Sequence, residues 1–350
     1  MSSTVPAELG FYMPAEWHPH EATWLSWPKD PETWPDRVPQ VEQILVEMIT
    51  AVSANEKINL LVDDEEVEIS VRSRCNFAEA KNIHFIRIAT ADSWVRDYGP
   101  NFLIDDNGGL AYNDWVFNAW GNKYEELKRD DSIPARLENI LNVPRFEPGI
   151  VMEGGSIEVN GAGVVLTTEQ CLLNPNRNPH LSRAEIEEYL KGYLAAAKIL
   201  WLGEGIIGDD TDGHIDDIAR FVSPTTIVCA VEDDPSDANY EILQDNLERL
   251  KRMTDARGRP FELVTLPMPG IVGGQSADTR KLDRLPASYA NFYIANGVVL
   301  APIFGHANDS RAIETLQRLF PTRRVVPINC EPLVWGMGTI HCVTQQEPKP

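Results

Sequence analysis

A glycine-rich segment near the C-terminus delivers a cysteine whose setting differs from that of the other four. Gly336–Cys342 has the sequence Gly-Met-Gly-Thr-Ile-His-Cys, and glycine permits positive φ angles and leaves room for a ligand. Cys229, in contrast, lies in an apolar run and is predicted to be a small buried hydrophobe. Because the thiolate is the nucleophilic form of cysteine, Cys342 is the candidate nucleophile.

A second segment, Gly213–Asp217, carries a histidine two residues before a carboxylate. On a strand, the side chains of His214 and Asp216 would share one face. Such a pair can be a metal site, a catalytic pair or a satisfied core network, and the local sequence leaves all three open. A calcium loop is excluded because Gly208 and Ala219 would occupy its first and last ligand positions.

Two further segments place carboxylates beside aromatic residues or glycines. In Asp92–Pro100, Asp97 follows an arginine and lies close to Trp94. Glu153 follows an apolar run and precedes two glycines, which let a ligand or backbone come close. The alternatives are a structural salt bridge for the first segment and a strand-end glutamate at a tight turn for the second.

The charge balance favours a cationic partner. The 350 residues contain 53 Asp and Glu against 31 Lys and Arg, a formal net charge of −22. Such a surface repels phosphate backbones and anionic lipids, so neither a nucleic acid nor a membrane is expected as a partner. Acidity that only maintains solubility is the alternative. Five scattered cysteines, no signal-peptide core and no apolar run of about 18 residues predict a cytoplasmic protein.

The elements that must position these residues alternate between strands and helices, which indicates an α/β protein. No linker divides the chain, so we expect a single catalytic domain over 1–350 with a flexible tail at 347–350. A weak internal echo relates Gly213–Asp217 to Gly305–Asp309. The predicted strands are Ile58–Val62, Ile83–Ile88, Asn101–Ile104, Gly163–Thr167, Thr226–Ala230, Gly297–Ala301 and Arg324–Ile328, and the predicted helices are Val38–Ser53, Arg183–Leu194, Asn239–Met253 and Ser310–Leu319.

Seven short segments, in order along nearly the whole chain, resemble the agmatine deiminase family, which is grouped with bacterial peptidyl-arginine deiminases. These segments are Met13–Trp17, Trp94–Pro100, Phe117–Gly121, Glu153–Ser156, Asn174–Pro179, Gly213–Asp216 and Ile340–Gln346. The resemblance implies a pentein-type five-bladed α/β propeller, in which pseudo-fivefold ββαβ units surround a central active site. Such a repeat would account for the internal echo.

The resemblance also implies roles for matching residues, without any cofactor or metal. Cys342 would be the nucleophile and His214 the general acid and base. Asp97, Glu153 and Asp216 would be carboxylates near the guanidinium of the substrate, and Trp94 would line its pocket. The implied reaction converts agmatine and water into N-carbamoylputrescine and ammonia, a step in putrescine and polyamine biosynthesis.

These residue types suit a guanidinium group, which is planar, cationic and rich in N–H donors that pair with carboxylates. A histidine with a pKa of about 6.5 can protonate the departing ammonia and then activate water. A papain-like amidase would need N–H donors around its oxyanion, and carboxylates would oppose that charge. In the empty site the same carboxylates should raise the pKa of the Cys342 thiol.

Other readings stay open at this point. Tyr98 stands where the family usually has Thr, and Met337 and Thr339 interrupt a run usually written Gly-Gly-Gly-Asn, so the substrate could instead be peptidyl or free arginine. A non-catalytic guanidine-binding protein is a rival from another class, and a metallohydrolase that uses His214, Asp216 and Asp97 is a third. The sequence leaves open whether the chain forms a homo-oligomer.

Overall fold

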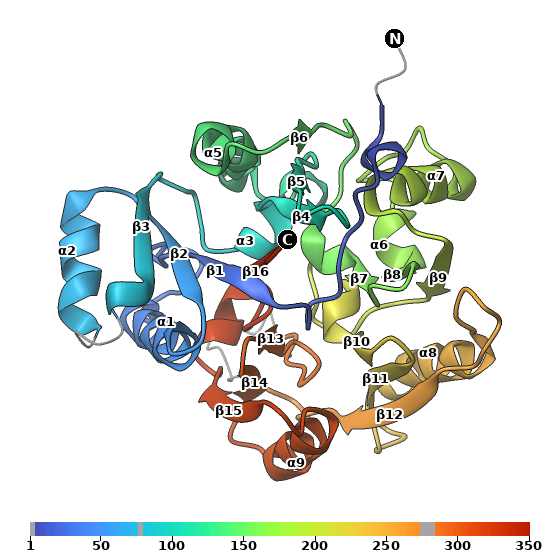
Figure 1. The fold of residues 1–350 in the computed structure, drawn as a ribbon. Helices are drawn as coiled ribbons and strands as arrows, with labels where there is room; N and C mark the ends of the chain where they lie inside the picture. Colours follow the sequence, from blue (N-terminus) through green and yellow to red (C-terminus); the bar gives the residue numbers. More distant parts are fainter. Residues whose placement is uncertain (1–3, 76–79, 274–283) are drawn as a thin grey trace.

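Five small β-sheets surround a common centre in the computed structural model, which describes residues 4–75, 80–273 and 284–350. The longer helices lie on the outside of the ring, and strand β16 runs into its centre (Figure 1). This arrangement confirms the expected five-bladed α/β fold.

Four of the five units have the same plan. Two strands pair antiparallel, and helical segments then lead to a third strand parallel to the second, because a parallel pair needs a long crossover connection. The strands are β4 (Asn101–Ile104), β5 (Leu110–Asn113), β6 (Arg145–Phe146), β7 (Glu158–Val159), β8 (Val164–Thr168), β9 (Lys198–Leu202), β10 (Ala219–Ser223), β11 (Thr226–Val231), β12 (Glu262–Pro267), β13 (Tyr293–Ala295), β14 (Val298–Ile303) and β15 (Arg324–Asn329).

The crossover helices turn one apolar side to the sheets. In the helix Arg183–Leu194, for example, Ile186 and Leu190 are buried, and a capping box formed by Ser182 and Glu185 fixes its start. The crossover helices are α4 (Ala119–Asn122), α5 (Ile133–Leu141), α6 (Glu169–Leu172), α7 (Arg183–Leu194), α8 (Tyr240–Arg252) and α9 (Asp309–Leu319).

The two ends of the chain together build the remaining unit. Strand β16 (Gln345–Pro348) pairs antiparallel with β1 (His20–Ser26), and β1 is parallel to β2 (Lys57–Val62), which is parallel to β3 (Ile83–Arg87). Helix α1 (Val38–Ser53) connects β1 to β2, and α2 (Glu65–Arg74) connects β2 to β3.

The prediction of a flexible tail at 347–350 is therefore wrong for its first two residues. Glu347 and Pro348 belong to β16, and the Glu347 carboxylate accepts a hydrogen bond of 2.7 Å from the Trp24 indole. The Lys349 amide also donates to the Pro19 carbonyl at 2.8 Å. The polar composition of this segment hides a strand because its partner lies more than 300 positions away in the sequence.

The predicted strands and helices all occur, with ends within two residues of the expected positions. The internal echo, however, does not mark equivalent positions of the repeat. Gly213–Asp217 precedes the first strand of its unit, β10, whereas Gly305–Asp309 follows the second strand of the next unit, β14. The repeat is real, but the two glycine-led segments do not mark it.

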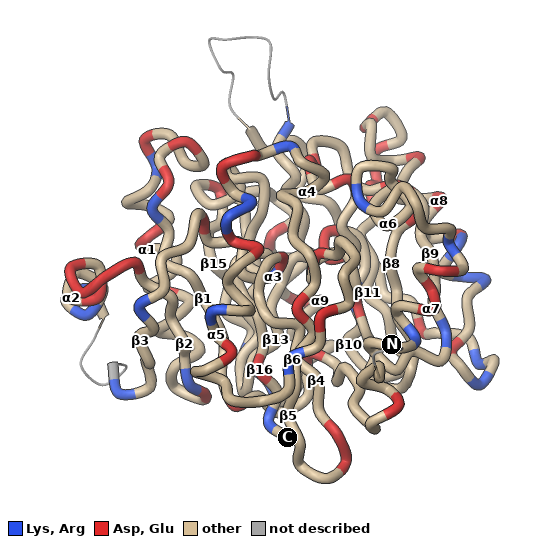
Figure 2. The backbone as a smooth tube through the Cα atoms, turned by 90° about the horizontal axis from the view of Figure 1, so that it is seen from above, with Lys and Arg blue, Asp and Glu red and all other residues tan. Residues whose placement is uncertain are grey.

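In Figure 2 acidic positions are spread over many of the outer segments. Across the described ranges, no helix has both the length and the apolar character that crossing a bilayer requires.

Candidate active site

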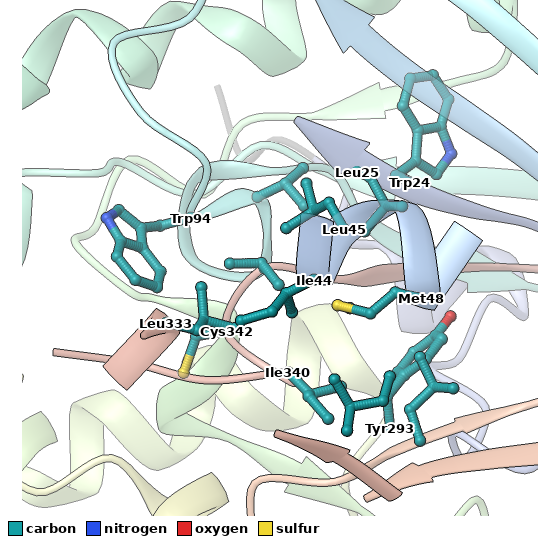
Figure 3. Close-up of a cluster of buried hydrophobic side chains, with 14 of the residues drawn as sticks. Trp24, Leu25, Ile44, Leu45, Met48, Trp94, Tyr293, Leu333, Ile340 and Cys342 are labelled. Atoms are coloured by element: carbon teal, nitrogen blue, oxygen red, sulfur yellow. The ribbon is translucent and has the colours of Figure 1, made fainter. Parts of the chain in front are cut away.

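The segment that carries Cys342 is anchored in the largest cluster of buried hydrophobic side chains, which also contains Trp94, Leu333 and Ile340 (Figure 3). Gly338 makes this arrangement possible: a Cβ atom there would lie 2.7 Å from the Trp94 ring and 3.1 Å from the Cys342 sulfur. The glycine-rich approach thus leaves the thiol uncovered.

A second glycine marks the point where the predicted site residues meet. A Cβ atom at Gly155 would lie 2.6 Å from Nδ1 of His214, 2.8 Å from Oδ1 of Asp97 and 3.1 Å from Oδ2 of Asp216. Three short helical segments bring these side chains together: α3 (Val95–Tyr98), η4 (Gly154–Ser156) and η5 (Ile215–Asp217). Residues that are far apart in the sequence therefore form one buried cluster.

The strand assumed for His214 and Asp216 is not present. His214 is the N-cap residue of η5, and Asp216 lies inside this 3-10 turn. Both side chains still face Gly155, because the turn, rather than the alternation of a strand, directs them. The two side chains lie near one another as expected, but the predicted strand was wrong.

Asp97 is buried, and each of its carboxylate oxygens accepts a hydrogen bond. Its Oδ2 accepts a hydrogen bond from the Trp120 indole at 2.9 Å, and its Oδ1 accepts one from the Gly155 amide at 2.9 Å. Burial raises the pKa of Asp97 to about 6, helped by the negative charges of Asp216 and Glu153. The carboxylate is thus ionised at neutral pH and protonated in mild acid.

Glu153 is fully buried, and its Oε1 accepts a hydrogen bond of 2.7 Å from Nε of Arg177. A Glu153 oxygen, the Cys171 sulfur and a His214 nitrogen all lie within 4.8 Å of one another. Burial opposes a charged imidazole, but Asp97, Cys171 and Glu153 outweigh it and raise the pKa of His214 well above its usual value.

The described residues contain one group with the spacing of metal ligands, and it is Glu153, Cys171 and His214 rather than the rival set of His214, Asp216 and Asp97. The Arg177 guanidinium already pairs with Glu153 in this group. A fixed cation and a readily protonated imidazole both oppose a metal ion at this group.

The Cys342 thiol lies between the Asn291 amide and the Asp216 carboxylate. The Asn291 amide donates to its sulfur at 3.2 Å, and the sulfur lies 3.9 Å from Oδ2 of Asp216. Burial, followed by the charges of Asp216, Asp217 and Asp97, raises the pKa of the thiol well above its usual value. The direction is the expected one, although Asp217 contributes where Glu153 was expected.

A cavity of about 540 Å³ opens onto this cluster. Of the residues predicted for the site, Trp94, Asp97 and Cys342 line the cavity, whereas Glu153, His214 and Asp216 lie deeper, each at most 1% exposed. The lining also contains four carboxylates that the sequence did not single out: Asp30, Glu32, Glu126 and Asp210. The cavity is thus suited to a substrate with positive charge along its length.

The departures from the family pattern fall into two groups. Tyr98 does not line the cavity, and its hydroxyl donates to the Asp92 carbonyl at 2.9 Å. Thr339 is buried and donates to Asn291 at 2.7 Å, whereas Met337 does line the cavity. Only Met337 is therefore placed to touch a substrate.

Sequence reasoning missed the residues behind the site. His341 hydrogen-bonds Asp216 and Glu16, each at 2.7 Å, and Arg96 and Arg220 contact Glu16 in turn. His341 and Glu16 both lie in segments that carry the family resemblance. Their residue types alone gave no sign that they meet.

Comparison with known proteins agrees with this geometry. Residues 12–348 match the family described as Porphyromonas-type peptidyl-arginine deiminase. An agmatine deiminase of Stutzerimonas stutzeri is 39% identical over 99% of this chain and 98% of its own. The structure of the Enterococcus faecalis agmatine deiminase has a TM-score of 0.92 at 36% identity, covering 100% of this chain and 99% of its own. A C. jejuni agmatine deiminase with substrate bound has a TM-score of 0.85 at 32% identity, covering 96% of both chains. The chain therefore belongs to the Porphyromonas-type peptidyl-arginine deiminase family.

Proposed function

We propose that the chain hydrolyses agmatine to N-carbamoylputrescine and ammonia through a covalent intermediate on Cys342. The observation that carries the proposal is the convergence of the thiol with Asp97, Asp216 and His214 at the base of an acidic cavity. Relatives named agmatine deiminases, similar over nearly their whole length, support this substrate.

In the proposed reaction, Asp97 and Asp216 hold the guanidinium plane, the Cys342 thiol releases its proton to solvent as the cation binds, and the thiolate adds to the central carbon. Protonated His214 gives its proton to one amino group, and the C–N bond breaks to release ammonia. A positively charged thiouronium intermediate remains on the sulfur. Neutral His214 then takes a proton from water, and hydroxide adds to the carbon. The added hydroxyl loses its proton to solvent and the C–S bond breaks, which releases the neutral ureido product and the thiolate. The negative charge of Glu153 favours the protonated form of His214.

The cavity lining favours agmatine over free arginine. Within the described part of the chain, no Lys or Arg side chain lines the cavity to pair with an α-carboxylate. The distal ammonium of agmatine instead meets carboxylates. Asp210 is the best placed of these, because it is less exposed than Glu32 and Glu126 and receives a hydrogen bond from the Tyr124 hydroxyl.

We expect Asp210→Asn to raise the KM for agmatine by about tenfold with little change in kcat, because the lost contact binds the remote end of the substrate. Butylguanidine, which lacks the distal ammonium, serves as the matched substrate control and should be turned over equally by both proteins. Equal losses on both substrates would remove Asp210 from the tail site.

We also expect substrate-assisted ionisation of Cys342. Because burial and neighbouring carboxylates raise the thiol pKa in the empty site, a bound guanidinium should lower it. The measurement is a pH series of iodoacetamide alkylation at Cys342, followed by mass spectrometry, with and without a non-hydrolysable guanidine. An apparent pKa below about 7 in the free enzyme would contradict this and indicate a resting thiolate.

The function is tested by incubating the purified protein with agmatine and identifying both products by mass spectrometry. Ammonia and N-carbamoylputrescine in equal amounts support the enzyme, whereas binding without turnover indicates a guanidine-binding protein. The proposed chemistry needs no metal or organic cofactor, so activity should survive a chelator. Loss of activity with the chelator would support the metallohydrolase.

We further propose that the chain is a single catalytic domain and that it works in the cytoplasm. Light scattering of the purified protein decides whether it forms a homo-oligomer.

A further inference from the structure

His341 lies between two carboxylates immediately before the nucleophile. Its Nδ1 is 2.7 Å from Oδ2 of Asp216, and its Nε2 is 2.7 Å from Oε2 of Glu16. The three side chains are buried, at 1%, 0% and 4% exposure for His341, Asp216 and Glu16. Ionised carboxylates only accept hydrogen bonds, so both ring nitrogens must carry protons for both bonds to form.

The surroundings keep both carboxylates ionised. Burial opposes the charge on Glu16, but Arg220 and His341 outweigh it and lower its pKa. Burial likewise opposes the charge on Asp216, and the hydrogen bond and charge of His341 lower its pKa. A neutral imidazole would leave one of the two carboxylates without a donor, which is costly for a buried charge.

Ion pairs continue behind His341. Arg220 lies 2.9 Å from Glu16 and 2.8 Å from Glu158, and Arg96 lies 3.4 Å from Glu16. Glu16, which accepts the second bond of His341, is thus held in place by two arginines.

The bond to His341 fixes the orientation of the Asp216 carboxylate. The Cys342 sulfur, which must bond the guanidinium carbon, lies 3.9 Å from Oδ2, the oxygen that His341 holds. A Cβ atom at Gly155 would meet this same oxygen beside His214 and Asp97. Oδ1 of Asp216 is buried and has no hydrogen-bond partner among the residues that the structure describes. The carboxylate held by His341 is therefore the one that an N–H group on the guanidinium carbon can reach.

We propose that His341 is a positioning residue, which donates hydrogen bonds from both ring nitrogens and holds the Asp216 carboxylate in place for the guanidinium group. The inference rests on the proposed function for the identity of the substrate. Glu16, Arg96 and Arg220 act behind it by holding the imidazolium in place. His341 transfers no proton in the reaction.

The first test needs neither a variant nor a substrate. Neutron diffraction from deuterated crystals of the wild-type protein should show deuterons on both Nδ1 and Nε2 of His341, because each nitrogen faces a carboxylate oxygen at 2.7 Å. A single deuteron on the ring would overturn the proposal, whatever the enzyme acts on.

The second test compares two buried histidines. His341→Gln keeps one N–H donor and loses the charge, and we expect it to weaken agmatine binding about tenfold or more in a Cys342→Ala background, measured by calorimetry. His20→Gln is the matched control: His20 is buried beside Glu56 at 3.2 Å and does not line the cavity. Equal affinity in both variants would contradict the proposal.

The pH dependence separates positioning from a general loss of structure. Without the cation, the pKa of Asp216 should rise, so agmatine affinity in His341→Gln should fall more steeply than in wild type between about pH 8 and 6. Asp97 titrates in both proteins and provides the common background. The charged or titratable groups that face Asp216 are His341, Arg220, His214, Asp217, Asp97 and Cys342. Parallel pH profiles for variant and wild type would leave His341 with a structural role only.

The two hypotheses fail in different ways. If wild-type protein releases no ammonia from agmatine, the proposed function is wrong, but the neutron result still decides the charge of His341. If wild-type protein is active and His341→Gln binds agmatine normally, only the positioning role is lost. A His341→Gln variant that does not fold leaves the neutron measurement as the deciding result.

Discussion

Replacing Cys342 with alanine should reduce ammonia release from agmatine by about four orders of magnitude or more, because no other thiol reaches the cavity and the covalent step has no substitute. Cys342→Ser should be nearly as inactive, since a hydroxyl in this acidic setting ionises even less readily than the thiol. Both variants should remain folded, because each changes a single small side chain that lines the cavity.

The matched control is Cys229→Ser, which changes a thiol that is 2% exposed within β11 and does not line the cavity. It should lower the melting temperature and leave kcat/KM unchanged in the folded protein. A Cys342→Ala protein that turns over agmatine at a near wild-type rate would eliminate the covalent mechanism.

The carboxylates should give the next largest effects. Asp97→Asn, Glu153→Gln and Asp216→Asn keep size but remove charge, and each should reduce kcat/KM by about two to three orders of magnitude. For Asp97, an amide also places an N–H group opposite either the Trp120 indole or the Gly155 amide, both of which already donate to it. For Glu153, the loss also removes one of the two anionic partners of the buried Arg177, the other being Asp212.

These effects should not add, because one guanidinium couples them. The measurement is a double-mutant cycle between Asp97→Asn and Asp216→Asn, based on kcat/KM for agmatine. The double variant should lose much less activity than the product of the two single losses. Strict additivity would mean that the two carboxylates do not share a substrate.

The sequence predicts most of the helices and strands because the spacing of apolar residues depends on local structure. Helix α1, for example, occupies the predicted residues Val38–Ser53. Strand β16 was missed because its polar residues resemble a tail, and only pairing with β1, at the other end of the chain, makes them a strand. Such ring closure is a property of the whole fold and leaves no local pattern.

The candidate site was likewise predicted from the sequence only in part. Cys342, His214 and the three carboxylates stand in recognisable motifs, and the structure brings them together around Gly155 and the cavity. Asn291 and Glu16 could not be assigned, because their contacts with Cys342 and His341 span 51 and 325 positions. Their roles depend on three-dimensional proximity at the centre of the ring, which residue type does not encode.

The most direct test of the account is a competition for one enzyme preparation. Agmatine, arginine and a blocked arginyl peptide are mixed in equal amounts, and the conversion of each guanidine to its ureido product is followed by mass spectrometry. The acidic cavity predicts that agmatine is consumed first, by a factor of about a hundred or more over the other two. Preferential conversion of arginine or the peptide would contradict the assignment, and no conversion of any guanidine would contradict the enzyme.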